Sequence, residues 1–286
     1  MDNKIILSVD SSVDLDKDIL EKYNVKINTP IHIILEGKSY DDMVDVTPDM
    51  IFDNYFKTGN LPKTSAANCQ EFIEKFKPFV DDGYEIIHIS IGNRLSTSYS
   101  QSCLAAEELG NIYVINSQNV TTGAGMIVAE TAKRISQGMA AKDIVKEIEA
   151  IVPKVCADFV LEKLTFLHAG GRCSAVEMFG ANLLKLRPCI IINSNDGGSL
   201  SIGKKYRGNI DKVFKTYADE KLANLESYDD ARIFITHSNV DKDILDQIYK
   251  LIESKNYFKE ILVTKAGCTV SSHWGPGTLG LVCMKK

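Results

Sequence analysis

The chain has 286 residues, of which 44% are hydrophobic and 25% charged, and a formal net charge of −5; these values are typical of a globular protein with one large domain or two ordinary ones. The acidic balance argues against a general nucleic-acid binder, which carries a basic patch. No segment approaches the ~18 uninterrupted apolar residues of a membrane span, so we expect no stable membrane insertion.

The first half of the chain alternates between strand and helix patterns. Strands are predicted at residues 5–9, 86–91 and 112–115, with extended chain over 25–35. Helices are predicted at residues 15–23 after an Asp14 cap, from Thr47 onward, and at 68–80, 97–109, 122–137 and 141–151. Strands that alternate with helices of this length indicate a parallel sheet covered by helices.

The second half has a different pattern. Strands are predicted at residues 156–161, 189–193, 199–205, 232–236, 260–264 and 279–284, and helices at 174–186, 209–223 and 241–255. The Asn-Asp-Gly-Gly sequence at 195–198 is a hairpin signal between two of these strands. A hairpin among helices indicates an α+β domain.

We therefore predict an α/β protein with two domains. Residues 1–155 are expected to form a parallel-sheet, Rossmann-like α/β domain, and residues 156–286 a C-terminal α+β domain with a mixed sheet. No flexible linker separates them, so the domains should pack closely. A ligand cleft is expected between them, because ligands favour domain interfaces.

Two hydroxyl clusters stand where helices are predicted to begin. One is Lys-Thr-Ser-Ala-Ala-Asn at 63–68, and the other is Arg-Leu-Ser-Thr-Ser-Tyr-Ser at 94–100. A helix N-terminus presents unpaired N–H groups and a partial positive charge, so added hydroxyls favour binding of a carboxylate or phosphate. The alternative is that Asn68 and Ser96 are ordinary N-caps, and Asn68 with Glu71 has capping-box spacing.

Aspartates form two further candidate groups. Asp10 ends the first strand, where open parallel sheets bind ligands, so it is either a nucleophile or metal ligand, or a turn residue. Asp14 is interpreted as a turn and capping residue. Asp41, Asp42 and Asp45 are expected to form a solvated loop, with a metal site as the alternative.

No cofactor, metal site or catalytic group is predicted. The seven cysteines are odd in number and lack a CxxC pair, so we expect reduced thiols. Residues 1–7 lead straight into a strand without a signal-peptide pattern, so we expect a cytoplasmic protein. The chain lacks the short motifs of nucleotide-binding proteins and hydrolases. Hydroxyls without an evident base indicate binding rather than catalysis. His88, inside a predicted strand, is assigned a structural role.

Short motifs follow one another along the whole chain. They are residues 9–15 (Val-Asp-Ser-Ser-Val-Asp-Leu), 40–42 (Tyr-Asp-Asp), 64–65 (Thr-Ser), 89–99 (Ile-Ser to Leu-Ser-Thr-Ser-Tyr), 116–125 (Asn-Ser to Thr-Gly-Ala-Gly), 171–172 (Gly-Arg), Arg207 and 273–278. In this order they resemble the DegV family of bacterial fatty-acid-binding proteins. That family includes the acyl-carrying B subunit of bacterial fatty acid kinase.

The resemblance implies that a long-chain fatty acid such as palmitate, stearate or oleate is buried between the two domains. It implies that Thr64 and Ser96, with their neighbours Ser65 and Thr97, hold the carboxylate. Thr97 stands where the family motif has glycine. A kinase subunit that resembles dihydroxyacetone kinase is the implied partner. Three residues are expected near the head group or this partner: Arg172, Arg207 and His273, the last on a rigid Gly-Pro-Gly loop.

Our leading interpretation is a carrier without catalytic activity, which presents the acyl carboxylate to a separate kinase for phosphorylation. The alternative is a small-molecule phosphotransferase or phosphatase that uses Asp10 and the hydroxyl clusters. A third interpretation is a regulatory sensor whose domain closure reports lipid supply. An enzyme needs a metal or nucleotide and a sensor needs another partner, so ligand extraction and affinity capture would separate the three.

Overall fold

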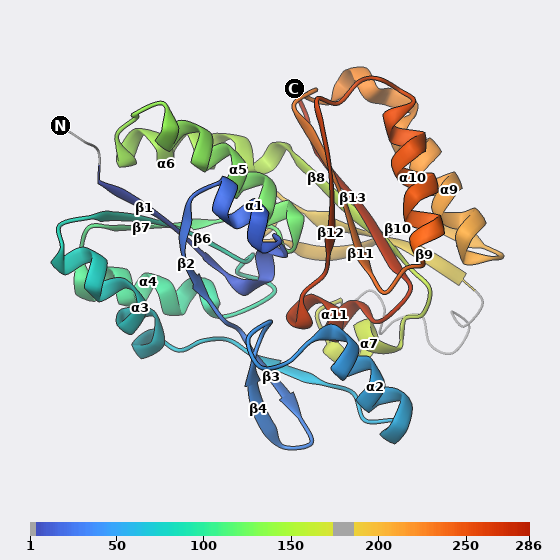
Figure 1. The fold of residues 1–286 in the computed structure, drawn as a ribbon, viewed down its shortest axis with the longest axis horizontal. Coiled ribbons are helices and arrows are strands. Elements are labelled where there is room, and N and C mark those ends of the chain that lie inside the picture. The colour runs from blue at the N-terminus through green and yellow to red at the C-terminus, as the bar shows by residue number, and fades with distance from the viewer. Residues whose placement is uncertain (1–3, 174–185) are drawn as a thin grey trace.

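The computed structural model describes residues 4–173 and 186–286 and contains two domains built on separate sheets (Figure 1). The predicted fold class, a parallel α/β domain followed by an α+β domain with a mixed sheet, is confirmed. The helix predicted from the Ser174 capping box lies outside the described residues. Within the described ranges, no helix is both long and apolar enough to span a bilayer.

The N-terminal sheet has four parallel strands in the order β2-β1-β6-β7. These strands are β1 (Ile5–Asp10), β2 (Val25–Thr29), β6 (Glu85–Ser90) and β7 (Ile112–Asn116). A parallel sheet buries both faces, and neighbours such as Ile86 and Ile87 accordingly point into different hydrophobic clusters.

Helices cover both faces of this sheet. One face packs on α3 (Cys69–Asp81) and α4 (Ser98–Leu109), and the other on α5 (Thr122–Ser136) and α6 (Ala141–Ile151). The short helix α1 (Lys17–Lys22) lies beside β2. The sequence predicted a helix over 15–23 capped by Asp14, and this cap is wrong. The N-cap of α1 is Asp16, whereas Asp14 is buried in a left-handed conformation with φ 49°.

The C-terminal sheet has six strands in the order β10-β9-β8-β13-β11-β12. They are β8 (Val155–Leu161), β9 (Leu186–Asn193), β10 (Ser199–Arg207), β11 (Arg232–Ser238), β12 (Glu260–Lys265) and β13 (Thr278–Met284). Only β11 and β12 pair in parallel; the other neighbours are antiparallel. Helices α9 (Ile210–Lys221) and α10 (Lys242–Glu253) cover one face.

The opposite face of the C-terminal sheet packs against the N-terminal domain. Phe159, Ile190 and Phe234 share one buried cluster with Ile127 and Val128 of α5. The two domains therefore have a common hydrophobic core and are not joined by a loose linker. Short 3₁₀ segments, at Ser11–Val13, Val152–Lys154 and Leu222–Ser227, connect neighbouring elements.

A third, small sheet of order β4-β3-β5 connects the two domains at the lower edge of Figure 1. Its strands are β3 (His32–Leu35), β4 (Lys38–Asp41) and β5 (Lys63–Ser65), and α2 (Pro48–Thr58) follows β4. This small sheet packs on two short helices from the C-terminal half, α7 (Thr165–Gly170) and α11 (Cys268–Trp274). Phe166 of α7 makes edge contacts with Phe52 and Tyr55 of α2. The sequence did not predict β5, α7 or α11.

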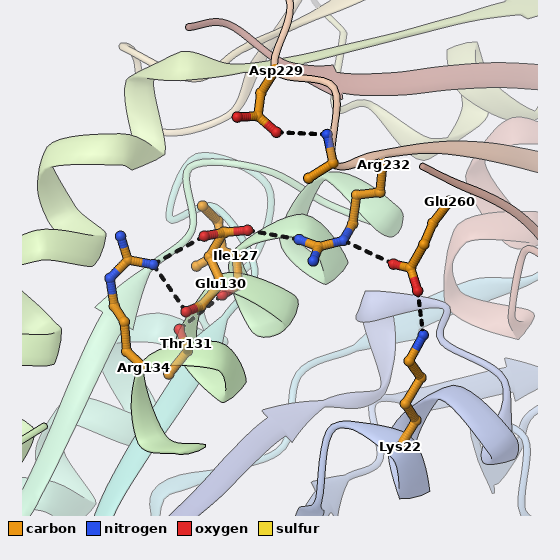
Figure 2. Close-up of polar contacts among 9 residues, drawn as sticks. Lys22, Ile127, Glu130, Thr131, Arg134, Asp229, Arg232 and Glu260 are labelled. Atoms are coloured by element: carbon orange, nitrogen blue, oxygen red, sulfur yellow. Dashed lines mark hydrogen bonds and ion pairs between the residues drawn. The ribbon is translucent and has the colours of Figure 1, made fainter. Parts of the chain in front are cut away.

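A chain of ion pairs also joins the domains (Figure 2). Arg232 lies 2.7 Å from Glu130 of α5 and 3.4 Å from Glu260. Glu130 also pairs with Arg134 at 3.0 Å, and Glu260 pairs with Lys22 of α1 at 2.5 Å. Glu130 is buried and the Arg232 side chain is only 12% exposed, so each largely neutralises the charge of the other where little water is present.

Candidate functional site

A cavity of about 570 Å³ lies between the two domains and the small sheet. Its size is within the usual range for small-molecule sites. Its apolar wall is formed by Ile31, Ala66, Ile91, Leu95, Val120, Leu167, Leu200, Val270 and Trp274. Its polar wall is formed by Thr64, Asn93, Arg94, Ser96, Thr97, Tyr99, Ser100, Thr269, His273 and Arg172. The cavity therefore combines a continuous apolar lining with a polar one.

Thr64 and His273 meet at this cavity. The Oγ1 atom of Thr64, in the edge strand β5, lies 2.9 Å from Nε2 of His273. The prediction that His273 sits on a glycine loop is wrong, because the residue occupies the last turn of α11 and only the following residues form the turn. The other ring nitrogen, Nδ1, is buried without a hydrogen-bond partner among the described residues. It packs on Gly170, where an added Cβ would lie 2.2 Å from Nδ1.

The His273 ring is neutral at physiological pH. Burial, and secondarily the charge of Arg172, lowers the pKa of His273 to about 4. A neutral imidazole carries one N–H group. We assign it to Nε2, where it donates to Thr64, because a buried N–H without an acceptor is rarer than an unused lone pair.

The first hydroxyl cluster leads into a helix as predicted, since α3 begins at Cys69 with Asn68 as its N-cap. Thr64 itself lies earlier, in strand β5, and not at the helix N-terminus. The predicted capping box is confirmed: Asn68 Oδ1 accepts from the N–H of Glu71 at 3.1 Å, and Glu71 accepts from the N–H of Asn68 at 2.7 Å. Pairing of β5 with β3 places Thr64 at the cavity wall.

The second hydroxyl cluster does stand at a helix start. Helix α4 begins at Ser98 and its N-cap is Thr97, which makes no side-chain capping bond, so the alternative of Ser96 as the N-cap is wrong by one residue. The Ser96 Oγ atom accepts from the N–H of Ser98 at 3.2 Å, and Ser96 lines the cavity together with the exposed Thr97. The preceding loop is held by the C-terminal domain, since the N–H of Arg94 donates to the carbonyl of Gly197 at 3.0 Å.

The remaining predicted site residues divide into two groups. Arg172 lines the cavity, is exposed, and donates to the Gly170 carbonyl at 2.6 Å. Over residues 4–173 and 186–286, no carboxylate lies within ion-pair distance of Arg172. Ser65 and Arg207 are exposed and are not among the described residues of the cavity wall, so their roles stay predictions.

Two of the candidate aspartates, Asp42 and Asp10, are buried. Asp42 is only 2% exposed, so the prediction of a solvated loop is wrong for this residue, although Asp45 is exposed. Asp10 is fully buried as a turn residue, and its carboxylate accepts hydrogen bonds from Ser12, Ser90 and the N–H of Ile91. Burial raises the pKa of Asp10. In the described part of the chain, no three His, Cys, Asp or Glu residues are grouped to hold a metal ion.

His88 has the structural role assigned to it. Its Nδ1 lies 2.9 Å from Ser8 Oγ, and its ring contacts those of Phe72 and Phe76 at centroid distances of 5.3 and 5.4 Å. Burial lowers the pKa of His88 to about 3. It is therefore a neutral core residue.

Sequence reasoning missed several residues of the cavity wall. Trp274 is 3% exposed and stacks on Phe159 with ring centroids 4.1 Å apart. Leu167 comes from the unpredicted α7 and Thr269 from the unpredicted α11. The position of Trp274 next to His273 could have indicated that Trp274 belongs to the cavity wall. The helix itself could not be predicted, because seven residues are too few to give a clear periodicity.

Comparison with known proteins identifies what this chain is similar to. The family model described as an uncharacterised protein of the DegV family matches residues 4–286. A DegV domain-containing protein of Clostridium perfringens is 31% identical over 281 residues, which cover 98% of each chain. A structure described as showing fatty acid binding by a DegV family protein of Thermus thermophilus has a TM-score of 0.88 and 25% identity, over 99% of this chain and 100% of that one. DegV of Bacillus subtilis, described as a fatty acid binding protein, shares the fold with a TM-score of 0.85 and 22% identity, over 99% of each chain.

Proposed function

The chain belongs to the DegV family, and from that premise we propose that it binds a long-chain fatty acid in the cavity between its domains. One observation carries the proposal: a single cavity joins an extensive apolar wall to Thr64, Ser96 and His273. The Thermus thermophilus relative, described as fatty acid binding, supports the ligand class. Palmitate, stearate and oleate are the expected ligands.

The carboxylate is received by hydroxyl groups. With Nε2–H of His273 donating to Thr64, the hydroxyl hydrogen of Thr64 remains available for a ligand oxygen. Ser96 supplies a second hydroxyl beside the N-terminus of α4, whose partial positive charge favours an anion. Arg172 adds a full positive charge nearby. Each hydrogen bond to a charged group contributes about 1.5–3 kcal/mol.

The acyl chain is received by the apolar wall. Leu167, Val270 and Trp274 come from the C-terminal domain, whereas Ile91 and Val120 come from the N-terminal domain. Burying each methylene group contributes about 0.8 kcal/mol, so a long chain supplies most of the affinity. The hydroxyls and Arg172 then fix the orientation of the ligand.

The protein acts as a carrier that presents the bound carboxylate to a separate kinase, which resembles dihydroxyacetone kinase. Two features support this role: Arg172 is exposed beside the head-group residues, and Arg207 is exposed at the end of β10. Guanidinium groups suit phosphate through paired donors. The alternative of a phosphotransferase that uses Asp10 is less well supported, because Asp10 has no exposed surface and does not line the cavity.

Extraction of the purified protein tests the ligand. The protein is denatured, and the organic phase is analysed by mass spectrometry, with a buffer blank and an unrelated protein from the same host as controls. A long-chain fatty acid in stoichiometric amount is expected. Absence of any fatty acid, together with no uptake of added palmitate or oleate, would overturn the proposal.

Reconstitution with a partner kinase and ATP tests presentation. The Arg207→Ala variant should retain fatty acid but form little acyl phosphate, since Arg207 lies outside the cavity wall. Lys205→Ala, two residues earlier in the same exposed strand end, is the matched comparison. Full acyl phosphate formation by Arg207→Ala would show that Arg207 does not contribute to the surface that contacts the kinase.

A further inference from the structure

Asp42 links the small sheet to α11. It follows β4 directly and is 2% exposed. Its Oδ1 accepts from the N–H of Cys268 at 2.7 Å, and its Oδ2 accepts from the N–H and the hydroxyl of Thr269 at 3.3 and 2.6 Å. Ser11 also donates to Oδ2 at 2.8 Å. One carboxylate of the N-terminal domain thus holds the first residues of a helix of the C-terminal domain.

Helix α11 depends on such support. It has only seven residues, and helices of this length are not stable alone in water. The first N–H groups of any helix lack partners within the helix. Here these residues are buried, so water cannot supply the missing acceptors. The only other carboxylate on this end, among the described residues, is Asp14, whose Oδ1 accepts from the N–H of Gly267 at 2.8 Å.

Four residues of α11 form part of the cavity wall: Thr269, Val270, His273 and Trp274. The ring of His273 makes a single hydrogen bond, to Thr64, because its Nδ1 atom has no partner among the described residues. The position of this ring therefore follows from the position of the helix. A small displacement of α11 lengthens the contact between His273 and Thr64.

We propose that Asp42 is a positioning residue of the head-group site: it fixes the N-terminus of α11, and α11 holds His273 Nε2 against Thr64. The importance of this contact for the ligand rests on the proposed function. The contact itself belongs to the protein without ligand. A carboxylate that merely capped a distant helix would affect stability alone, whereas Asp42 also controls the environment of one histidine ring.

The test is nitrogen NMR of the delipidated protein labelled at histidine, with a pH titration, for the wild type, Asp42→Ala and Asp42→Asn. The wild-type His273 ring should stay neutral down to about pH 5. In Asp42→Ala, the N-terminus of α11 is no longer held, and the His273 ring becomes more exposed to water. Because burial is the main cause of its low pKa, the pKa of His273 should rise toward its ordinary value. Asp42→Asn should give a smaller change in the same direction. His273→Gln assigns the signal.

Two controls make the result decisive. Asp45→Ala removes an exposed carboxylate from the same turn and should leave the His273 signals unchanged. Palmitate binding, measured in parallel by calorimetry, should weaken about tenfold in Asp42→Ala and remain at the wild-type level in Asp45→Ala. If the wild type does not bind palmitate, the proposed function fails, and the NMR result still decides the role of Asp42.

A folded Asp42→Ala protein whose His273 keeps its wild-type nitrogen shifts and low pKa would overturn the proposal. If Asp42→Ala does not fold, Asp42→Asn decides in the same way. That variant preserves the shape of the side chain and one acceptor, but it places an NH₂ group opposite the N–H of Thr269. Unchanged His273 signals in a folded Asp42→Asn protein would then contradict the role.

Discussion

The Nε2 atom of His273 lies 2.9 Å from the Oγ1 atom of Thr64, although 209 positions separate the two residues in the chain. This contact joins the edge of the small sheet to the last turn of α11, at the wall of the cavity. Because the His273 ring is neutral, it orients the Thr64 hydroxyl without adding charge. Arg94 and Arg172 both line the cavity, and Arg94 pairs with Asp196 at 2.8 Å, so the main positive charge beside the site comes from Arg172.

Removing a head-group hydroxyl should weaken fatty acid binding without unfolding the protein. Thr64→Val and Ser96→Ala each remove a hydrogen bond to a carboxylate, so palmitate affinity should fall about 10- to 100-fold. Ser65→Ala tests the third predicted hydroxyl, and because Ser65 neighbours Thr64 in β5 but is exposed and does not line the cavity, its loss should weaken binding less than the loss of Thr64. Calorimetric titration measures all three. Equal affinity of Thr64→Val, Ser96→Ala and the wild type would leave these hydroxyls with a structural role alone.

Gly170→Ala should displace the His273 ring. The added Cβ would lie 2.2 Å from Nδ1, so the ring must move away, and its bond to Thr64 must lengthen. Gly170 is the last residue of α7, so the helix preference of alanine, about 1 kcal/mol in a helix interior, offsets at most part of the roughly 1–3 kcal/mol that overpacking costs. Palmitate affinity should therefore fall in a protein that still folds, with a modestly lower melting temperature. Wild-type affinity in this variant would argue against a role for the ring position.

Three histidines with lowered pKa values should each make the protein less stable in mild acid. Burial lowers the pKa of His88 to about 3 and those of His237 and His273 to about 4. The unfolded chain takes up these protons near pH 6.5, so the stabilisation is complete above that pH and is lost as the pH falls toward 4. For His273 it amounts to about 3 kcal/mol.

Urea unfolding between pH 7 and pH 4 measures this dependence. Buried aspartates with raised pKa values act in the opposite direction, so the informative quantity is the difference between the wild type and His273→Gln. The variant should lose less stability on acidification. An identical pH dependence of both proteins would contradict the low pKa of His273.

Arg232→Ala should destabilise the contact between the domains. The substitution leaves Glu130, whose side chain is 8% exposed, without its nearest cation, although Arg134 at 3.0 Å still pairs with it. The cost should therefore be about 1.5–3 kcal/mol, the value of a lost hydrogen bond to a charged group, and not the larger cost of a fully unpaired buried charge. Lys22→Ala removes only an exposed pair and should cost at most about 1 kcal/mol. Chemical denaturation measures both. Adding Glu130→Ala to Arg232→Ala should recover part of the loss, and a strictly additive double variant would show that the pair is not energetically linked.

The larger elements could be predicted because each one carries its own signal. The strand at Ile5–Asp10 is a short apolar run, the helix at Thr122–Ser136 stops just before Gly138, and the Asn68 capping box marks the start of α3. The order of these elements indicates the two-domain fold. The local sequence was sufficient to predict these elements because each is long enough to carry its own apolar run, cap or stop residue.

The short elements could not be predicted, because tertiary contacts form them. Helix α11 has seven residues, and its N-terminal N–H groups bond to Asp42, 226 positions away from Cys268. Strand β5 has three residues and exists through pairing with β3. Since His273 and Thr64 lie in these two elements, motif order identified both residues but could not reveal their contact. The burial of Asp42 was missed for the same reason.

The most direct test of the account is calorimetric titration of the delipidated protein with palmitate and with methyl palmitate. The two ligands have the same acyl chain, but only palmitate carries a charged head group. We expect one palmitate to bind per chain and methyl palmitate to bind at least about tenfold more weakly, because the ester cannot accept charge-assisted hydrogen bonds from Thr64 and Ser96. No binding of palmitate, or equal affinity for the two ligands, would contradict this expectation.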